Sequence, residues 1–413
     1  MISVTDNCKL AKAAVPYLSA LSTADKNNML RIASDALTEQ AEYILSQNKI
    51  DLDNNGDKPK HILDRLALTE ERIKGMSDGL VKLIELPDPV GEITEEWTNH
   101  AGLLLKKVRV PFGVIGIIYE ARPNVTADAI GLCMKTSNAV VLRGSKDAIN
   151  SNKAIVKVIS DALNRNGYKS DFIQLVEDLS HESSEELMTA RGLVDVLIPR
   201  GSAKLINAVV TKSTVPVIET GTGNCHAYIH SSADPDMAET IILNGKLRRP
   251  SVCNALESLL IDEDVAEKIL PRVLSSLRKN GVEIRGCEKT CRIFPECVKA
   301  TEEDFYTEYL DLKISCKVVK NYSEAIEHIN KYGSGHSETI ISSDEAAETA
   351  FMKFVDSAAV YHNASTAFTD GFEFGLGAEM GISTQKLHAR GPLGLKELTS
   401  TKYCIFGNGQ TRK

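Results

Sequence analysis

A cysteine near the middle of the chain lies beside positive charges that could activate its sulfur. Cys253 is part of Arg248–Ala255, which reads RRPSVCNA and follows a helical stretch that ends near Leu247. Nearby positive charge favours the thiolate over the thiol, and a thiolate is a nucleophile toward activated carbonyl carbons. Taken alone, however, this cysteine is better explained as a small buried apolar residue.

Glu219 precedes this cysteine by 34 residues (253 − 219 = 34) and is followed by two glycines, in the segment Val217–Asn224, which reads VIETGTGN. Gly221 and Gly223 begin like a dinucleotide-binding fingerprint, but His226 occupies the place of the third glycine, so the Rossmann pattern is absent. The chain also has no phosphate-binding loop ending in Gly-Lys-Ser/Thr and no His-Glu-x-x-His motif.

The remaining cysteines do not predict a metal site. Cys287, Cys291 and Cys297 lie close together in the sequence, but their spacing differs from that of zinc ligands. The total of nine is odd, and the cysteines are scattered through apolar contexts. We therefore expect reduced, surface or half-buried thiols, no metal, and a cytoplasmic protein.

The composition is that of a globular protein. The chain has 413 residues, 43% of them hydrophobic and 25% charged, with a net charge of −8, so we expect two large domains. It contains no block of like charges and no apolar run near the ~18 residues of a membrane helix, so neither nucleic acid nor a membrane is an expected partner. The first six residues lack the pattern of a secretory signal.

The elements that must position these residues begin with helices. Apolar residues recur at intervals of three and four over 30–44 and 73–83, after start signals at Ser22 and Thr69. Residues 51–60 are predicted to be a polar connection.

From residue 113 onward, strands alternate with helices. Strands are expected at 113–119, 139–142, 172–176, 194–198, 215–219, 256–261, 317–319, 338–341 and 358–362, and helices at 127–134, 151–164, 184–191, 203–211, 265–278, 323–331 and 345–354. This order predicts parallel sheets in two α/β domains. A hairpin over 93–110 and a strand at 402–406 are left over, and their unpaired edges suggest pairing with another subunit.

The order of these segments resembles the aldehyde dehydrogenase superfamily, in which a glutamate-glycine motif precedes a nucleophilic cysteine. Val110–Gly116 resembles the family's first strand, and Asn138–Ser145 resembles the strand that contacts the coenzyme ribose. Pro199–Ser202 resembles the family's Gly-Ser turn, and Glu308–Leu310 resembles the segment with its ribose-binding glutamate. Within the superfamily, the γ-glutamyl phosphate reductase family is most similar, through Tyr119–Thr126, Glu219–His226, His362–Thr366 and Ala389–Leu395. The resemblance covers nearly the whole chain.

The resemblance implies an aldehyde dehydrogenase-like α/β fold with two parallel α/β domains and a small β oligomerisation arm. Residues 1–225 would form the cofactor-binding domain, including the helical N-terminus and a hairpin at about 90–110. Residues 226–371 would form the catalytic domain with Cys253. Residues 372–413 would be a C-terminal return segment and an oligomerisation strand.

The activity that the resemblance implies is NADPH-dependent reduction of L-glutamyl 5-phosphate to L-glutamate 5-semialdehyde and phosphate, in proline biosynthesis. The carbon chain would be carried as a thioester on Cys253, and the backbone N–H of Cys253 and the amide of Asn124 would stabilise the oxyanion. Asn124 could instead be a turn residue after proline. An aldehyde-oxidising or CoA-acylating dehydrogenase of the same fold, or a scaffold without catalysis, are the alternatives.

The same resemblance implies an NADPH/NADP site. Arg143 would bind the 2′-phosphate with help from Lys146, and Ser202 would contact the coenzyme phosphates or ribose. Glu308 would bind the nicotinamide ribose. The other cofactor-binding candidates are Ser145, Glu219, Thr220 and Gly221. The ordinary structural explanations are a solvated charge for Arg143, a helix N-cap for Ser202 and a salt bridge for Glu308.

Cationic and hydroxyl groups are expected around a substrate that carries a phosphate and an amino acid. The candidates are Arg122, Arg248, Arg249, Ser365 and Thr366. Residues 374–390 are rich in glycine and could form a mobile lid or an interface loop. We expect a homo-oligomer, dimer or higher, and association with glutamate 5-kinase is left open.

Overall fold

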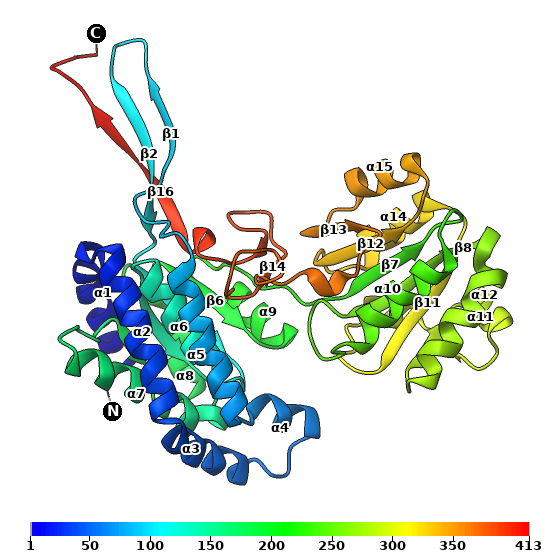
Figure 1. The fold of residues 1–413 in the computed structure, drawn as a ribbon, viewed down its shortest axis with the longest axis horizontal. Helices are drawn as coiled ribbons and strands as arrows, with labels where there is room; N and C mark the ends of the chain where they lie inside the picture. Colours follow the sequence, from blue (N-terminus) through cyan, green and yellow to red (C-terminus); the bar gives the residue numbers. More distant parts are fainter. Residues whose placement is uncertain (1, 413) are drawn as a thin grey trace. The chain divides into compact units, whose positions relative to one another are not determined.

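The computed structural model describes residues 2–412, apart from the side chains at 60 and 61. The chain divides into two compact units (Figure 1). Unit 1 comprises Met1–Thr220, Gly375–Gly381 and Leu393–Lys413, and unit 2 comprises Gly221–Phe374 and Ile382–Pro392. Both contain a parallel sheet covered by helices, as the alternation of strands and helices predicts.

Unit 1 begins with a series of helices, two of which start at the predicted capping residues Ser22 and Thr69. The series comprises α1 (Val4–Ala20), α2 (Thr23–Glu39), α3 (Ala41–Asn54), α4 (Lys60–Leu66) and α5 (Glu70–Glu85). The side chains of Ser22 and Thr69 accept hydrogen bonds from backbone N–H groups of the first turns of α2 and α5. The prediction of a polar connection over 51–60 is wrong at its start, because α3 continues to Asn54. The buried Asp51 carboxylate accepts hydrogen bonds from Ser151 N and Oγ, at 2.8 and 2.6 Å, which satisfies its charge inside the fold.

The sheet of unit 1 has the order β5-β4-β3-β6, and all of its strands are parallel. Its strands are β3 (Val114–Tyr119), β4 (Ala139–Arg143), β5 (Ile173–Leu175) and β6 (Val196–Arg200), and its helices are α6 (Asn124–Lys135), α7 (Ile149–Arg165), α8 (His181–Thr189) and α9 (Ala203–Lys212). The strand order reverses between β3 and β6, and ligands of open α/β sheets bind at the carboxyl ends of strands beside such a point.

A three-stranded antiparallel arm also belongs to unit 1. It is formed by β1 (Ile93–Thr98), β2 (Leu104–Pro111) and β16 (Thr399–Phe406), which lie side by side with β2 in the centre (Figure 1). The predicted hairpin and the predicted C-terminal strand are thus confirmed, and they pair with each other. Trp97, Tyr403, Ile405 and Phe406 remain exposed on the two outer strands.

Unit 2 contains a seven-stranded parallel sheet of order β10-β9-β11-β8-β7-β12-β13. Its strands are β7 (Cys225–Ile229), β8 (Leu256–Asp262), β9 (Glu283–Gly286), β10 (Val298–Lys299), β11 (Lys313–Val319), β12 (Ser337–Ile341) and β13 (Ala359–His362), and a separate pair is formed by β14 (Ile382–Ser383) and β15 (Gly391–Pro392). Its helices are α10 (Pro235–Leu247), α11 (Glu263–Lys279), α12 (Glu288–Ile293), α13 (Glu302–Tyr306), α14 (Tyr322–Tyr332) and α15 (Glu345–Phe354). Aliphatic side chains of α10 and α11 pack on β7, β8 and β11 to form the core.

One strand prediction is wrong, and the strands β7, β9, β10, β14 and β15 were not predicted. Residues 215–219 do not form a strand, and Val217 makes only an isolated bridge with Leu197. The strand β7 was not predicted, because His226 and Tyr228 make its sequence look polar. Both residues are fully buried: His226 Nδ1 forms a hydrogen bond with Asn224 O at 2.9 Å, the backbone N–H of His226 donates to a carboxylate oxygen of Glu338, and the Tyr228 hydroxyl donates to Asp262.

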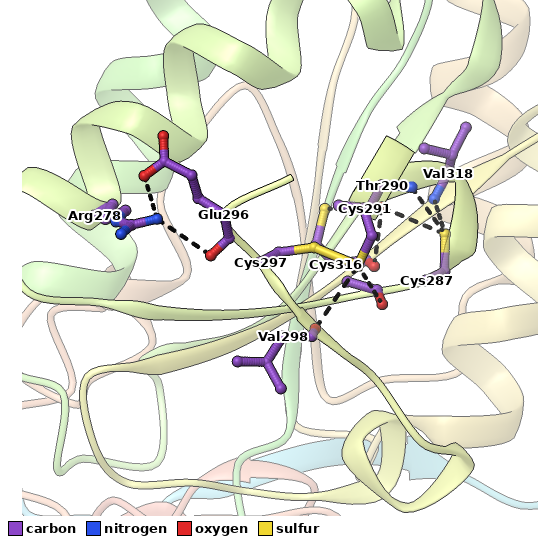
Figure 2. The surroundings of a disulfide bond; sticks show 10 residues. Arg278, Cys287, Thr290, Cys291, Glu296, Cys297, Val298, Cys316 and Val318 are labelled. Carbon is purple, nitrogen blue, oxygen red and sulfur yellow. Dashed lines mark hydrogen bonds and ion pairs between the residues drawn. A yellow bond between two sulfur atoms is a disulfide. The ribbon is translucent and has the colours of Figure 1, made fainter. Parts of the chain in front are cut away.

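The expectation that all cysteines are reduced is also wrong, because Cys291 and Cys297 form a disulfide (Figure 2). The turn between α12 and β10 brings these two residues together, which sequence spacing alone did not reveal. The other seven cysteines are not in disulfides. Among the residues described, no three or more His, Cys, Asp or Glu side chains are placed to hold a metal ion, and none of the helices is both long and apolar enough to cross a membrane.

Candidate active site

The nucleophile candidate lies at the amino edge of the sheet of unit 2. Gly223 and Asn224 precede β7, Cys253 precedes β8, and Glu308 precedes β11. Because parallel strands begin at the same edge, these loops lie together. The backbone N–H of Gly223 donates a hydrogen bond to Glu308 Oε1 at 2.6 Å, and the N–H of Asn224 donates one to Ser334 Oγ at 2.9 Å.

Cys253 is half-buried on a tightly held loop and is not sealed in the core. Its carbonyl oxygen accepts a hydrogen bond from Cys225 Sγ at 3.1 Å, and it also faces Gly223, where a Cβ atom would lie 1.5 Å from this oxygen. Glycine at position 223 is therefore required by close backbone contact. A thiol on a fixed backbone with partial exposure suits a nucleophile.

Of the predicted substrate residues Ser365 and Thr366, Thr366 supports this loop. Thr366 Oγ1 donates a hydrogen bond to the carbonyl of Asn254 at 2.8 Å, and Asn254 Nδ2 donates to the carbonyl of Thr369 at 3.0 Å. Ser365 Oγ accepts a hydrogen bond from Ala367 N. Both predicted residues are buried, but only Thr366 has a supporting role toward the loop, because Ser365 caps its own turn. Their contact with substrate stays a prediction.

Arg248 and Arg249 begin the loop that carries Cys253. Both are exposed, and within residues 2–412 neither guanidinium forms an ion pair. Arg248 is also the C-cap residue of α10, where a positive charge is favourable. Both explanations given for this pair, anion binding and helix capping, are therefore compatible with its position.

The predicted coenzyme residues of unit 1 lie at the carboxyl end of β4. Arg143 Nη2 donates a hydrogen bond to Ser180 O at 2.8 Å, whereas Arg143 Nε and Ser145 Oγ are buried and have no hydrogen-bond partner among the described atoms. Burial lowers the pKa of Arg143, and the Asp178 carboxylate opposes this effect. Lys146 follows and is exposed. Unpartnered buried donors fit an anionic ligand.

Ser202 is the N-cap residue of α9. It donates two hydrogen bonds to Glu120, a residue that was not predicted to belong to the site. Its N–H and Oγ donate hydrogen bonds to the two carboxylate oxygens of Glu120, at 2.8 and 2.6 Å. Glu120 follows β3, the strand beside β6. The helix terminus thus already binds one carboxylate, which shows that its geometry suits an anion.

Asn124 is the first residue of α6 and is exposed. Its Nδ2 donates a hydrogen bond to Asp128 Oδ2 at 3.2 Å, one turn further along the helix. Burial raises the pKa of Asp128 to about 6, although this hydrogen bond and the charge of Arg200 oppose the rise. The amide is thus oriented by a carboxyl group that the sequence did not single out.

The glutamate-glycine motif crosses the division between the two units. Thr220 is buried in unit 1, where its Oγ1 donates a hydrogen bond to Pro199 O at 2.6 Å, and Glu219 precedes it. Gly221 belongs to unit 2, where its N–H donates to Ile382 O at 2.8 Å. Arg122 lies between Glu120 and Asn124 and donates its N–H to Glu120 O at 2.7 Å.

The aldehyde dehydrogenase family model matches residues 3–295. The chain belongs to this family. It is 54% identical to a gamma-glutamyl phosphate reductase of Heliobacterium modesticaldum, over 98% of this chain and 97% of the relative. The structure of a gamma-glutamyl phosphate reductase from Thermotoga maritima has a TM-score of 0.96 and 45% identity, with full coverage of both chains. An engineered glycolyl-CoA reductase with bound NADP+ shares the fold, with a TM-score of 0.72 at 16% identity over 98% of this chain and 97% of that one.

The predicted family and the predicted fold class are therefore confirmed. Members of the aldehyde dehydrogenase family use a nicotinamide coenzyme. The assignment of coenzyme binding and catalysis to separate sequence ranges, and the roles of individual residues, stay predictions.

Sequence reasoning missed a buried ion pair whose two residues flank the loop that carries Cys253. Glu257 is the second residue of the apolar strand β8, and Lys246 lies in the last turn of α10. Both side chains are fully buried and form an ion pair at 2.7 Å. A lone charge inside a run of aliphatic residues was the available signal, because such a charge needs a partner.

Proposed function

We propose that this chain reduces L-glutamyl 5-phosphate to L-glutamate 5-semialdehyde and phosphate, with NADPH, in proline biosynthesis. The observation that carries the proposal is the near-complete match to relatives named gamma-glutamyl phosphate reductase. The half-buried Cys253 on its fixed loop supports it chemically.

The proposed chemistry starts at the sulfur of Cys253. Its thiolate attacks the γ-carbonyl carbon of the acyl phosphate, the C–O bond to phosphate breaks, and a thioester forms. When bound, the dihydronicotinamide coenzyme supplies a hydride. The reduced carbon then releases the sulfur as the C–S bond breaks, which returns the thiolate and frees the aldehyde.

Negative charge develops on the carbonyl oxygen in both stages, so hydrogen-bond donors directed at that oxygen should dominate the rate enhancement. We assign this role to the backbone N–H of Cys253 and to the amide of Asn124. The hydrogen bond from Asn124 to Asp128 supports the assignment, because it restricts the rotation of the amide while one N–H remains available.

Residues at the carboxyl end of β4 would hold the coenzyme's adenosine. The unpartnered Arg143 Nε and Ser145 Oγ would bind a 2′-phosphate, with Lys146 nearby, which favours NADPH over NADH. The N-terminus of α9 with Ser202 would bind the coenzyme's phosphates or ribose, and Glu308 the nicotinamide ribose. Glu219 is given no catalytic step, because hydrolysis of the thioester would waste the substrate.

The exposed arginines would bind the substrate's anionic groups. Arg248 and Arg249 adjoin the nucleophile in sequence and present guanidinium groups that make no ion pair in the described part of the chain. Phosphate and carboxylate both accept paired hydrogen bonds from such groups. We also propose that the arm of β1, β2 and β16 is a subunit contact in a homo-oligomer, since it leaves apolar residues exposed along open strand edges.

The test is the reverse reaction, in which glutamate semialdehyde, phosphate and NADP give NADPH absorbance. Cys253→Ala should abolish this activity, whereas Cys287→Ser, a change at another half-buried cysteine, should retain it. NADP reduction without phosphate would favour an aldehyde-oxidising enzyme, and a requirement for coenzyme A would favour an acylating one. Undiminished activity in Cys253→Ala would reject the mechanism.

A further inference from the structure

An ion pair buried in unit 2 links the nucleophile loop to the segment that carries Glu308. Lys246 lies just before this loop and Glu257 just after it, and their side chains meet at 2.7 Å with neither exposed to solvent. Burial raises the pKa of Glu257, and the ammonium of Lys246 opposes that rise. The lysine therefore provides a countercharge that favours the ionised form of this carboxyl group inside the protein.

The second oxygen of this carboxylate has a separate contact. Glu257 Oε1 accepts a hydrogen bond from the backbone N–H of Leu310 at 3.0 Å. Leu310 has φ of 54°, a left-handed conformation that residues other than glycine rarely adopt, so the surroundings must hold it. Glu308, two residues earlier, accepts the hydrogen bond from Gly223 N, and Gly223 lies against the carbonyl of Cys253.

We propose that Glu257, charge-balanced by Lys246, is a positioning residue that fixes residues 307–311 and thereby places Glu308 for the coenzyme's nicotinamide ribose. The carboxylate holds Leu310, and this contact fixes the direction in which the Glu308 side chain leaves the backbone. The assignment rests on the proposed role of Glu308, but the effect of Glu257 on the segment does not depend on that role.

Two double variants separate this positioning from a general effect on stability. Lys246→Met with Glu257→Gln removes both charges but keeps a carbonyl oxygen that can accept from Leu310 N. Lys246→Met with Glu257→Leu removes both charges and that acceptor. Apolar residues often replace a buried ion pair without loss of stability, so both variants should fold, which thermal unfolding will verify.

The first readout is hydrogen exchange of the peptide that contains residues 307–312, which needs neither substrate nor coenzyme. Exchange should accelerate by about tenfold in the Leu variant and stay within about twofold of the parent chain in the Gln variant, because only the former leaves the Leu310 N–H without its partner. Equal exchange in the parent chain and the Leu variant would overturn the proposal.

The second readout compares NADPH with 2′,5′-ADP, which lacks the nicotinamide half. The Kd of NADPH should rise by about tenfold in the Leu variant only, and the Kd of 2′,5′-ADP should stay within about twofold. Weaker binding of both ligands would indicate general disruption and would count against positioning. If the parent chain binds neither ligand, the proposed function fails, while the exchange result still decides the role of Glu257.

A matched control pair lies in unit 1. Lys26 and Asp88 also form a buried ion pair, and Asp88 Oδ1 also accepts a backbone hydrogen bond, from Val90 N at 3.0 Å. Lys26→Met with Asp88→Leu should leave NADPH binding and the exchange of residues 307–312 unchanged. Changes equal to those of the Glu257→Leu variant would show that loss of any buried pair produces them.

Discussion

Replacing Gly223 with alanine is expected to displace the backbone that carries Cys253. A Cβ atom at this position would lie 1.5 Å from the carbonyl oxygen of Cys253 and 2.6 Å from its Cα atom. Real Cβ contacts are essentially never shorter than 3.0 Å, so the oxygen and the new methyl group must separate by at least 1.5 Å (3.0 − 1.5 = 1.5). Both partners are backbone atoms, so no side-chain rotation can relieve the contact.

This displacement should affect catalysis more than stability. Overpacking of this kind typically costs about 1–3 kcal/mol of folding free energy, which a chain of this size tolerates. A nucleophile misplaced by about 1 Å loses about 100-fold in rate. We therefore expect kcat of Gly223→Ala to fall by about two orders of magnitude while the protein remains folded.

The assay is phosphate-dependent NADP reduction, together with iodoacetamide alkylation of Cys253 measured on its peptide. Gly75→Ala in α5 is the matched control, because a Cβ atom there meets nothing within 4 Å, and it should keep full activity. If Gly223→Ala retains the parent kcat and alkylation rate, the inference that backbone contact positions the nucleophile is wrong.

Three further predictions follow from other parts of the structure. Arg143→Ala should raise the Kd of NADPH by about tenfold more than that of NADH, measured by titration, and an equal change for both would contradict 2′-phosphate binding. Burial depresses the pKa of His328 to about 2, so the unfolded chain binds the extra proton below about pH 6.5. Stability should therefore fall as the pH drops below that value, by up to about 1.4 kcal/mol per unit, and calorimetry should show a smaller fall in His328→Phe. Tyr403→Lys with Ile405→Glu on β16 should lower the mass measured by light scattering, and an unchanged mass would exclude the arm as a subunit contact.

The sequence predicted best those elements whose burial is uniform. The strand β3 reads VIGIIY and is buried throughout, as a continuous apolar run in a parallel sheet should be. The strand β7 was missed because it buries two polar side chains, and the partner of the Tyr228 hydroxyl, Asp262, lies 34 residues away in the chain. Residues 215–219 are as apolar as a strand, but they make only an isolated bridge with Leu197 and not a continuous series of strand hydrogen bonds. The next residue, Thr220, donates its side-chain hydrogen bond to Pro199 O.

The candidate site was predictable where local sequence carries it. The segment around Cys253 could be recognised by its own residues and by its spacing from Glu219. The residues that hold the site in place could not be recognised from local sequence. Glu120 bonds to Ser202, which is 82 residues away in the chain, and Glu257 bonds to Leu310, which is 53 residues away. Such pairings depend on strand order, which alternation of strands and helices does not specify.

The pairing of β16 with β2 has a consequence for the order in which the protein is made. The strand β2 ends at Pro111 and β16 begins at Thr399, so 287 residues (398 − 111 = 287) must be synthesised between them. At about 5–20 residues per second, a ribosome needs roughly 15–60 s for this length. Throughout that interval one edge of β2 exposes unpaired backbone N–H and C=O groups, which can pair with a strand of a neighbouring chain. Nascent chains on one messenger are therefore expected to need a chaperone or rapid dilution until β16 closes the arm.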